Sequence, residues 1–395
     1  MDIPDSPPPS HHANDSATAF QNPWAVKSLL ASKQILSQFP IALAKRVDEL
    51  RTHRRPIEVV KPDFGVETAD EGVIKATWVG HAGFMVQLPK IDTLKPVRIL
   101  FDPIWSDRAS PNQYAGPRRR LPPPCKLEEL PDFQFVVTSH NHYDHLDWPT
   151  IDKIFKLKGR HVTFIAPLGH EPWFRGCGIP SDQIVELDWY ESADLRPSVN
   201  HPSVRFVCTP AQHASGRHLL DQRVALWASW VAKQEDERGS SASIYHAGNM
   251  SLIESLSDTG YMTQDGPCPA FAEIGQRYGP FDLAMIPIWR GGSLAWISAL
   301  GLRLVSTELL DGLHASPEHA LALHKDIRSR HSLGMHFATF AGSDAEALEP
   351  VAELIAEKEK LAGMAVGDWM EEGGFGVIDV GQTVVIPVGS ATDKD

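Results

Sequence analysis

The sequence predicts an α/β protein in which short buried strands alternate with helices. Two observations support this class: short apolar runs bounded by turn residues, and helical patterns between and after them. The chain has 395 residues, 42% of them apolar, which is enough for one large core or two smaller ones. The runs that we interpret as strands cover residues 73–79, 84–88, 97–101, 133–138, 162–166 and 204–208.

We expect the main domain over residues 71–388, preceded by an extension over residues 1–70. Residues 1–22 are rich in Pro and Ser and predict a disordered tail. Residues 26–51 have a roughly helical apolar spacing, interrupted by Pro40. The extension is expected to pack on the main domain, with a membrane or partner contact as the alternative.

Two local signals place turns and helix ends within the domain. Gly80-His81-Ala82-Gly83 separates the first two apolar runs and predicts a turn. The helical pattern over residues 316–330 begins with Ser316 at the N-cap position and Pro at the first helical position.

Charge and cysteine content exclude several classes of protein. There are 37 Lys and Arg residues against 50 Asp and Glu residues, a net charge of −13, which argues against a nucleic-acid partner. The 4 cysteines are far apart, so neither a disulfide framework nor a thiolate metal site is expected. The N-terminus does not resemble a signal or transit peptide, and no apolar run is long enough to cross a bilayer. We expect an intracellular protein, cytoplasmic or peripherally membrane-associated, whose organelle stays open.

A dense group of metal-ligand residues follows the strand expected over residues 133–138. His140, His142, Asp144 and His145 all lie just beyond its end. Imidazole and carboxylate groups suit zinc, iron or manganese, and burying four of them without a metal would leave polar groups unpaired. His140 and His142 are spaced to face one metal, and Asp144 and His145 are free to face a second.

Single residues elsewhere complete two sets of metal ligands. His213 lies just past a strand, Asp258 precedes Thr-Gly, and His336 ends a short apolar run. Together with the four clustered residues they supply enough ligands for two ions.

This ordered set of ligands resembles the metallo-β-lactamase superfamily, which implies a four-layer αββα sandwich with a dinuclear metal centre at one sheet edge. Further segments are similar to the N-acyl-phosphatidylethanolamine-hydrolysing phospholipase D family. The resemblance covers about residues 70–385. The segments that carry it are 77–82, 102–104, 106–111, 113–117, 139–147, 185–189, 226–230, 268–275, 279–284, 286–288, 314–318 and 336–340.

The resemblance implies two zinc ions per chain. One would be held by His140, His142 and His213, the other by Asp144, His145 and His336, with Asp258 as the bridging ligand. It also implies a reaction in lipid metabolism: hydrolysis of the phosphodiester bond of N-acyl-phosphatidylethanolamine, which gives an N-acylethanolamine and phosphatidic acid.

The same resemblance implies residues around the metals. Tyr143 and His314 would contact the phosphodiester, and His314 would orient an oxygen or protonate the leaving group. Capping the helix that starts at Ser316 is the alternative role of His314. Asp102 and Asp147 are candidates to orient metal-bound imidazoles, although Asp102 also fits a structural turn, and His81 is expected to support the ligands.

Two segments depart from the family pattern. Residues 249–257 separate Gly248 from Asp258, where the family runs directly into its aspartate. This insertion is a tolerated outward loop, an error in the gene model, or a lesion that disables the metal centre. Residues 291–313 are unusually apolar and fit a membrane-facing anchor or acyl groove, with a buried helix or a homodimer interface as the alternative.

Three functions remain in consideration. The first is a zinc phosphodiesterase acting on N-acyl-phosphatidylethanolamine at a membrane surface, with a membrane phospholipid as substrate. The second is a lactonase or phosphodiesterase acting on a soluble, phosphorylated substrate. The third is a lipid-binding homologue whose catalysis is impaired by the insertion.

Overall fold

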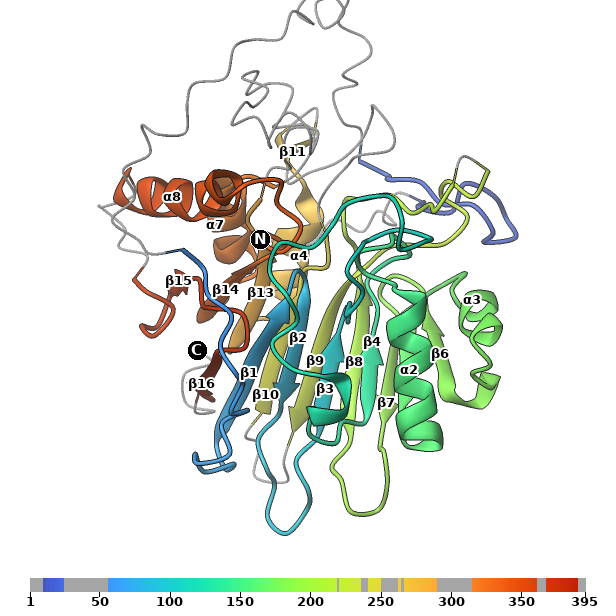
Figure 1. Cartoon of the computed structure of the whole chain (residues 1–395), viewed down its shortest axis with the longest axis horizontal. Coiled ribbons are helices and arrows are strands. Elements are labelled where there is room, and N and C mark those ends of the chain that lie inside the picture. The colour runs from blue at the N-terminus through green and yellow to red at the C-terminus, as the bar shows by residue number, and fades with distance from the viewer. Residues whose placement is uncertain are drawn as a thin grey trace, which may run out of the picture.

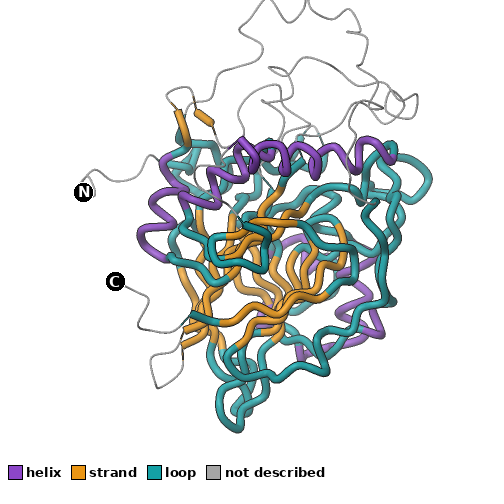
Figure 2. The backbone as a smooth tube through the Cα atoms, turned by 90° about the vertical axis from the view of Figure 1, so that its left-hand side faces the viewer, coloured by secondary structure: helices purple, strands orange, loops and turns teal. Residues whose placement is uncertain are grey.

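Two sheets pack face to face, with helices on their outer sides (Figure 1). The computed structural model describes residues 10–24, 56–218, 220–235, 241–249, 262–263, 266–289, 315–360 and 367–389. The tube view in Figure 2 places the strands in the centre and the helices outside them. This is the four-layer αββα arrangement that the resemblance to the metallo-β-lactamase superfamily implies.

The first sheet has the strand order β16-β1-β2-β3-β4-β5-β6. Strands β3 to β6 are parallel, and the remaining neighbours are antiparallel. The bounds are β1 Val73–Gly80, β2 Gly83–Gln87, β3 Arg98–Phe101, β4 Phe135–Val137, β5 Thr163–Pro167, β6 Ile184–Leu187 and β16 Thr383–Pro387.

The second sheet has the order β15-β14-β13-β10-β9-β8-β7. Here β10, β13, β14 and β15 are parallel, while β7 to β10 are antiparallel. The bounds are β7 Ser192–Leu195, β8 Val204–Thr209, β9 Ser229–Glu235, β10 Ser241–His246, β13 Leu283–Pro287, β14 His331–Met335 and β15 Gly374–Gly376. A separate two-stranded pair is formed by β11 Met262–Thr263 and β12 Gly266–Pro267.

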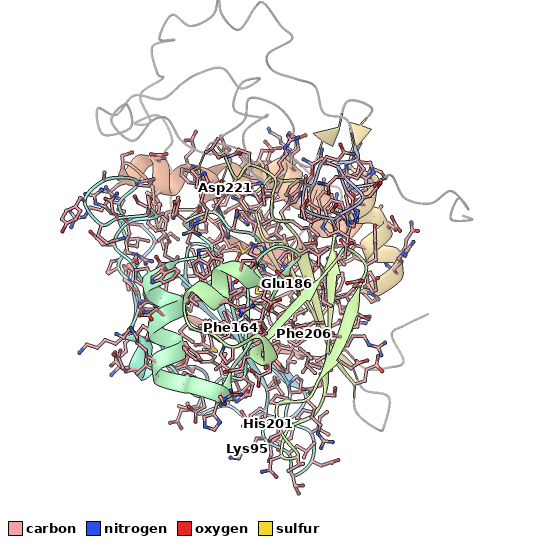
Figure 3. All side chains as sticks on the ribbon, turned by 90° about the vertical axis from the view of Figure 1, so that its right-hand side faces the viewer. Lys95, Phe164, Glu186, His201, Phe206 and Asp221 are labelled. Atoms are coloured by element: carbon pink, nitrogen blue, oxygen red, sulfur yellow. The ribbon has the colours of Figure 1, made fainter. Side chains whose placement is uncertain are left out.

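Alternate residues of each strand point to opposite faces of the first sheet, and both sets are largely apolar. The sheet therefore has a core on each of its faces. In β4, Phe135 and Val137 belong to the core between the sheets, whereas Val136 belongs to the core under the outer helices. Figure 3 shows Phe164 and Phe206, one from each sheet, in the interior, with Lys95 and His201 at the end of the molecule away from Asp221.

Helices cover the outer faces of both sheets. Helices α2 and α3 contribute apolar side chains to the core outside the first sheet. Helix α4 packs on α7, which contacts β13 of the second sheet and α8. The bounds are α2 Trp148–Lys158, α3 Glu171–Gly176, α4 Pro269–Tyr278, α7 Pro317–Asp326 and α8 Asp344–Lys360. Short 3₁₀ helices occupy Leu127–Glu129, Gly159–His161 and Ser181–Gln183.

Most expected elements are confirmed. All six predicted strands are present within a residue or two, and residues 81–82 form the turn between β1 and β2. Ser316 caps α7, its hydroxyl accepting a hydrogen bond from the backbone N–H of His319, but the helix ends at Asp326 rather than at residue 330. All four cysteines are free. Within the described ranges, no helix is both long and apolar enough to cross a bilayer.

The N-terminal tail corrects one expectation. The sequence predicts disorder over residues 1–22, yet residues 10–24 fold against the domain. Phe20 is only 1% exposed, and its backbone N–H donates to the carbonyl of Arg223. The polar composition of the segment predicts disorder, but the burial of one aromatic side chain is enough to anchor a short segment to the domain.

Candidate metal centre

The histidine-rich segment lies at the carboxyl end of the parallel strand β4. After Val137 the chain turns sharply, and the backbone N–H groups of His145 and Leu146 both donate to the carbonyl of His142. Helix α2 begins directly afterwards, with Asp147 as its N-cap. The turn therefore gathers side chains at one edge of the sheets.

The first ligand group consists of His140, His142 and His213. Nε2 of His140 lies 2.9 Å from Nδ1 of His142 and 2.9 Å from Nε2 of His213. Nε2 of His213 lies 3.2 Å from Nδ1 of His142. Three nitrogens that meet in one place form a suitable ligand set for a transition metal.

Burial keeps two of these imidazoles neutral. It lowers the pKa of His140 well below its ordinary value, and it lowers the pKa of His142 to about 4. Neutral imidazoles retain the lone pairs that coordinate metals, so both rings are available as ligands at neutral pH.

The second group joins His81, Asp144, His145 and His336. Oδ2 of Asp144 lies 2.8 Å from Nε2 of His81 and 3.5 Å from Nε2 of both His145 and His336. Burial alone would raise the pKa of Asp144, but the surrounding imidazoles hold it well below its usual range. The carboxylate is therefore ionised and can serve as a ligand.

Asp102 fixes the orientation of His145. Its carboxylate is fully buried and lies 2.7 Å from Nδ1 of His145, and it also accepts hydrogen bonds from the backbone N–H and the hydroxyl of Ser139. Burial opposes a charge on His145, but Asp144 and Asp102 outweigh it and raise the pKa of the ring. A carboxylate that holds one ring nitrogen leaves the other facing the metal.

The two groups are adjacent, and their chemistry fits a pair of metal ions. The rings of His140 and His145, one from each group, have centroids 4.2 Å apart. The ligand atoms are nitrogen and oxygen, which both zinc and iron accept. The structure thus contains His-rich sites consistent with a binuclear centre.

His81 joins the second group, and its hydrogen bond to Asp144 is the supporting role that the sequence suggests. It lies in the turn between β1 and β2 with a left-handed φ of 53°. Its backbone N–H donates to the hydroxyl of Thr339, and its carbonyl accepts from the backbone N–H of His336. The turn is therefore tied to the segment that carries His336.

Arg217, which the sequence does not mark as a site residue, contacts the loop that carries the metal ligands. Its guanidinium donates to the carbonyls of Asn141 and Leu146, at 2.8 Å each, and lies 4.0 Å from the ring centre of Tyr143. Arg217 therefore contacts residues 140–147, called the metal loop below, near both of their ends, and it also holds the ring of Tyr143. A single arginine four residues after His213 offers no sequence signal for this role.

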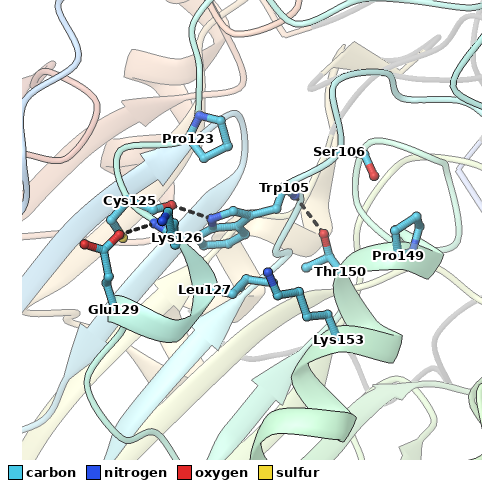
Figure 4. A pocket seen from close by; sticks show the side chains of 10 residues that line it. All are labelled: Trp105, Ser106, Pro123, Cys125, Lys126, Leu127, Glu129, Pro149, Thr150 and Lys153. Atoms are coloured by element: carbon cyan, nitrogen blue, oxygen red, sulfur yellow. Dashed lines mark hydrogen bonds between the residues drawn. The ribbon is translucent and has the colours of Figure 1, made fainter.

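Asp147 caps helix α2, and within the described residues none of its hydrogen bonds is to an imidazole. It accepts from Ser106 and from Thr150, the latter at the start of α2. A cavity of about 570 Å³ opens beside these two partners, with Trp105, Leu127 and Lys153 in its wall (Figure 4). None of the proposed metal ligands lines this cavity, so the candidate centre lies elsewhere.

Some predicted residues lie outside the described ranges. These are Asp258, His314 and the apolar segment 291–313. Asn249, the first residue of the insertion, is described: it is 4% exposed, and its side-chain oxygen has no hydrogen-bond partner within the described residues. The preceding Gly248 packs so closely that a Cβ there would lie 2.8 Å from the Cβ of Ser139. The strand end before the insertion therefore touches the residue next to His140.

Comparisons with known proteins identify the family of the chain. A model of the "Beta-lactamase superfamily domain" family matches residues 97–337. N-acyl-phosphatidylethanolamine-hydrolyzing phospholipase D 1 of Caenorhabditis elegans is 32% identical over 353 residues, covering 87% of this chain and 88% of the worm protein. The Saccharomyces cerevisiae mitochondrial protein of the same activity name is 30% identical over 301 residues, 76% of this chain and 52% of the yeast protein.

A Mycobacterium tuberculosis protein of unassigned function is 34% identical over 308 residues, 77% of this chain and 68% of that protein. Among solved structures, isothiocyanate hydrolase from Delia radicum gut bacteria has a TM-score of 0.50 at 15% identity, covering 78% of this chain and 98% of the hydrolase. That likeness concerns the fold alone. The chain belongs to the metallo-β-lactamase superfamily and, within it, to the family that includes the worm N-acyl-phosphatidylethanolamine-hydrolysing phospholipase D.

Proposed function

We propose that this metal-dependent hydrolase is a zinc phosphodiesterase that cleaves N-acyl-phosphatidylethanolamine to an N-acylethanolamine and phosphatidic acid. The observation that carries the proposal is the pair of adjacent ligand groups, in a chain that aligns with 88% of a worm protein named for this reaction.

The chain's own residues would divide the work as follows. His140, His142 and His213 would hold one zinc ion, and Asp144, His145 and His336 the other, with His81 hydrogen-bonded to Asp144. When bound, the ions supply Lewis acidity toward phosphate oxygens and lower the pKa of a nearby water. Asp102 keeps His145 in the ligand orientation, and Arg217 keeps the metal loop in its folded form.

Tyr143 is the proposed contact to the phosphodiester. It lies between two metal-ligand positions of the loop and is partly exposed, with Arg217 against its ring. The guanidinium therefore holds Tyr143 beside the metal ligands. His314 remains part of the proposal as a second contact to the phosphodiester.

The lipid side of the substrate is assigned to residues 291–313. Their apolar composition suits acyl chains or a peripheral contact with a membrane surface. A soluble substrate would have no use for such a segment, which is why we favour the phospholipid.

The test is incubation of zinc-loaded protein with vesicles containing N-acyl-phosphatidylethanolamine, with phosphatidic acid measured by mass spectrometry. We expect about two zinc ions per chain in the His140 centre and release of phosphatidic acid that is lost in His140→Ala. Turnover of bis(p-nitrophenyl) phosphate without release of phosphatidic acid would indicate a soluble substrate instead. A chain that binds no metal would leave only the non-catalytic, lipid-binding function.

A matched pair of variants locates the bridging carboxylate. If Asp258 is the bridging ligand, Asp258→Asn loses activity and one equivalent of zinc, while Asn249→Asp changes little. If the strand end reaches the metals instead, Asn249→Asp raises zinc affinity and Asp258→Asn is silent. Asn249 suits this test because its buried side-chain oxygen has no hydrogen-bond partner within the described residues.

A further inference from the structure

A third cluster of metal-ligand residues lies in the N-terminal segment, away from the centre described above. His11 and His12 both reach the carboxylate of Asp188. Nε2 of His11 lies 2.6 Å from Oδ1, and Nε2 of His12 lies 2.7 Å from Oδ2. We propose that His11, His12 and Asp188 form a third metal site that takes zinc or a similar divalent transition metal and fastens residues 10–24 to the domain.

The convergence of the two imidazoles is the first argument. Neighbouring residues of an extended chain normally point to opposite sides, yet His11 and His12 meet at one carboxylate. Two imidazoles and a carboxylate form a ligand set that suits zinc, iron or copper. Their ligand atoms lie within 4.8 Å of one another, and since ligands of one zinc ion lie up to about 4 Å apart, small rotations suffice to surround an ion.

The surroundings hold these ligands in place. The ring of His11 stacks on Trp189, with centroids 4.3 Å apart and planes 23° apart. Asp188 accepts a hydrogen bond from the backbone N–H of Trp189, and its own backbone N–H donates to Glu191. Burial alone would raise the pKa of Asp188, but hydrogen bonds and nearby imidazoles lower it, so the carboxylate is ionised. Ligating carboxylates are commonly hydrogen-bonded in this way.

The exposure of the cluster fits an open site. The side chains of His11, His12 and Asp188 are 18%, 29% and 18% exposed. An ion can enter from solvent, and a water can take the fourth position of a tetrahedral site.

The site would stabilise a segment that reaches the main centre. His12 and Phe20 pair in an antiparallel bridge, and beside it the backbone N–H of Gln21 donates to the carbonyl of His11. Beyond the buried Phe20, the side-chain amide of Asn22 donates to the carbonyl of His213 and accepts from Nε1 of Trp227. A metal at Asp188 would therefore hold residues 10–24 in place, and these residues contact the backbone of His213, a proposed ligand of the main centre.

Equilibrium dialysis of the metal-depleted full chain against Zn²⁺ alone, with zinc counted by mass spectrometry, tests the proposal. We expect the His11→Gln/His12→Gln variant to hold one zinc ion fewer than the unmodified chain. The control variant His161→Gln/His201→Gln removes as many imidazoles and should lose none. His140→Ala/His336→Ala should keep the third equivalent although the main centre is damaged, which separates this inference from the proposed function.

Hydrogen exchange supplies a second readout. Zn²⁺ should slow exchange of the backbone amides of residues 10–24 in the His140→Ala/His336→Ala variant, and this protection should vanish when His11 and His12 are also replaced. Equal zinc counts and equal protection with and without the two histidines, in folded proteins, would overturn the proposal and leave only a hydrogen-bonded contact.

Discussion

At the scale of single residues, the metal loop depends on Asp102 and Arg217, which are not themselves proposed ligands. Asp102 and Arg217 contact the loop from its two sides, one through Ser139 and His145 and the other through backbone carbonyls. The sequence made Asp102 a candidate because a metal-bound imidazole usually donates its second N–H to a carboxylate, with a structural turn as the alternative role. Arg217 could not be predicted, since its role arises only when the loop folds around it.

Replacement of Asp102 should weaken metal binding more than it weakens the fold. In Asp102→Asn the negative charge beside His145 is lost, so we expect zinc affinity to fall roughly 10- to 100-fold. Competition with a zinc-binding dye measures this change. Asp107→Asn is the matched control, because Asp107 is exposed and paired with Arg118. Equal affinities of the two variants would contradict the role given to Asp102.

Replacement of Arg217 should loosen the loop. Lysine keeps the positive charge but cannot donate to two carbonyls with the same fixed geometry, so Arg217→Lys should lower the unfolding free energy by about 1–3 kcal/mol. Urea denaturation of the metal-free protein gives the value. Arg205→Lys, at an exposed ion pair with Asp194, should change stability by less than about 0.5 kcal/mol.

At the scale of secondary-structure elements, the helices outside the second sheet pack with little tolerance. A Cβ on Gly275 of α4 would overlap the carbonyl oxygen of Asp326 at the end of α7. Gly275→Ala should therefore cost about 3 kcal/mol or more of unfolding free energy. Gly176→Ala in α3 is the control, since its nearest neighbour would be at 3.5 Å. Thermal unfolding followed by circular dichroism compares the two, and similar melting temperatures would contradict the close approach of α4 and α7.

His324 gives α7 a pH dependence. Nδ1 of His324 lies 2.8 Å from the hydroxyl of Ser332 in β14, and burial lowers its pKa from 6.5 to about 4. Between these pH values the unfolded chain binds a proton that the folded chain does not. The stability contribution is therefore complete above pH 6.5 and is lost as the pH falls toward 4, by up to roughly 3 kcal/mol.

The variant His324→Gln removes this titration. Its unfolding free energy should fall less steeply than that of the unmodified chain between pH 6.5 and 4.5, as measured by urea denaturation. Parallel slopes would show that His324 does not titrate differently in the folded and unfolded states.

At the scale of the whole molecule, the proposed ligands come from both sheets. His81 and the loop after β4 belong to the first sheet, whereas His213 and His336 follow β8 and β14 of the second. Because metal binds only the folded arrangement, its removal should lower the melting temperature by several degrees, and Zn²⁺ should restore it. Differential scanning fluorimetry with and without a chelator measures this, and the His140→Ala/His336→Ala variant should respond less.

The fold and most of the site could be predicted because the relevant signals are local. Apolar runs marked the strands, and four ligand-type residues between His140 and His145 marked the metal loop. What the sequence could not supply depends on long-range contacts: the place of His81 beside Asp144, the brace by Arg217, and the docking of Phe20. Asp258, His314 and residues 291–313 lie outside the described residues and stay predictions.

The spacing of the proposed ligands also sets the order of events as the chain is made. His336 lies 191 residues after His145, and their ring nitrogens meet at 3.1 Å. The ligand group that includes His336 therefore cannot close until nearly the entire domain has left the ribosome, whereas the group of His140, His142 and His213 is complete about 120 residues earlier in the chain. Contacts between such distant residues form late and slowly in folding. Until then Asp144 and His145 lie without His336, so the second group offers an incomplete set of ligands while the first can already be complete.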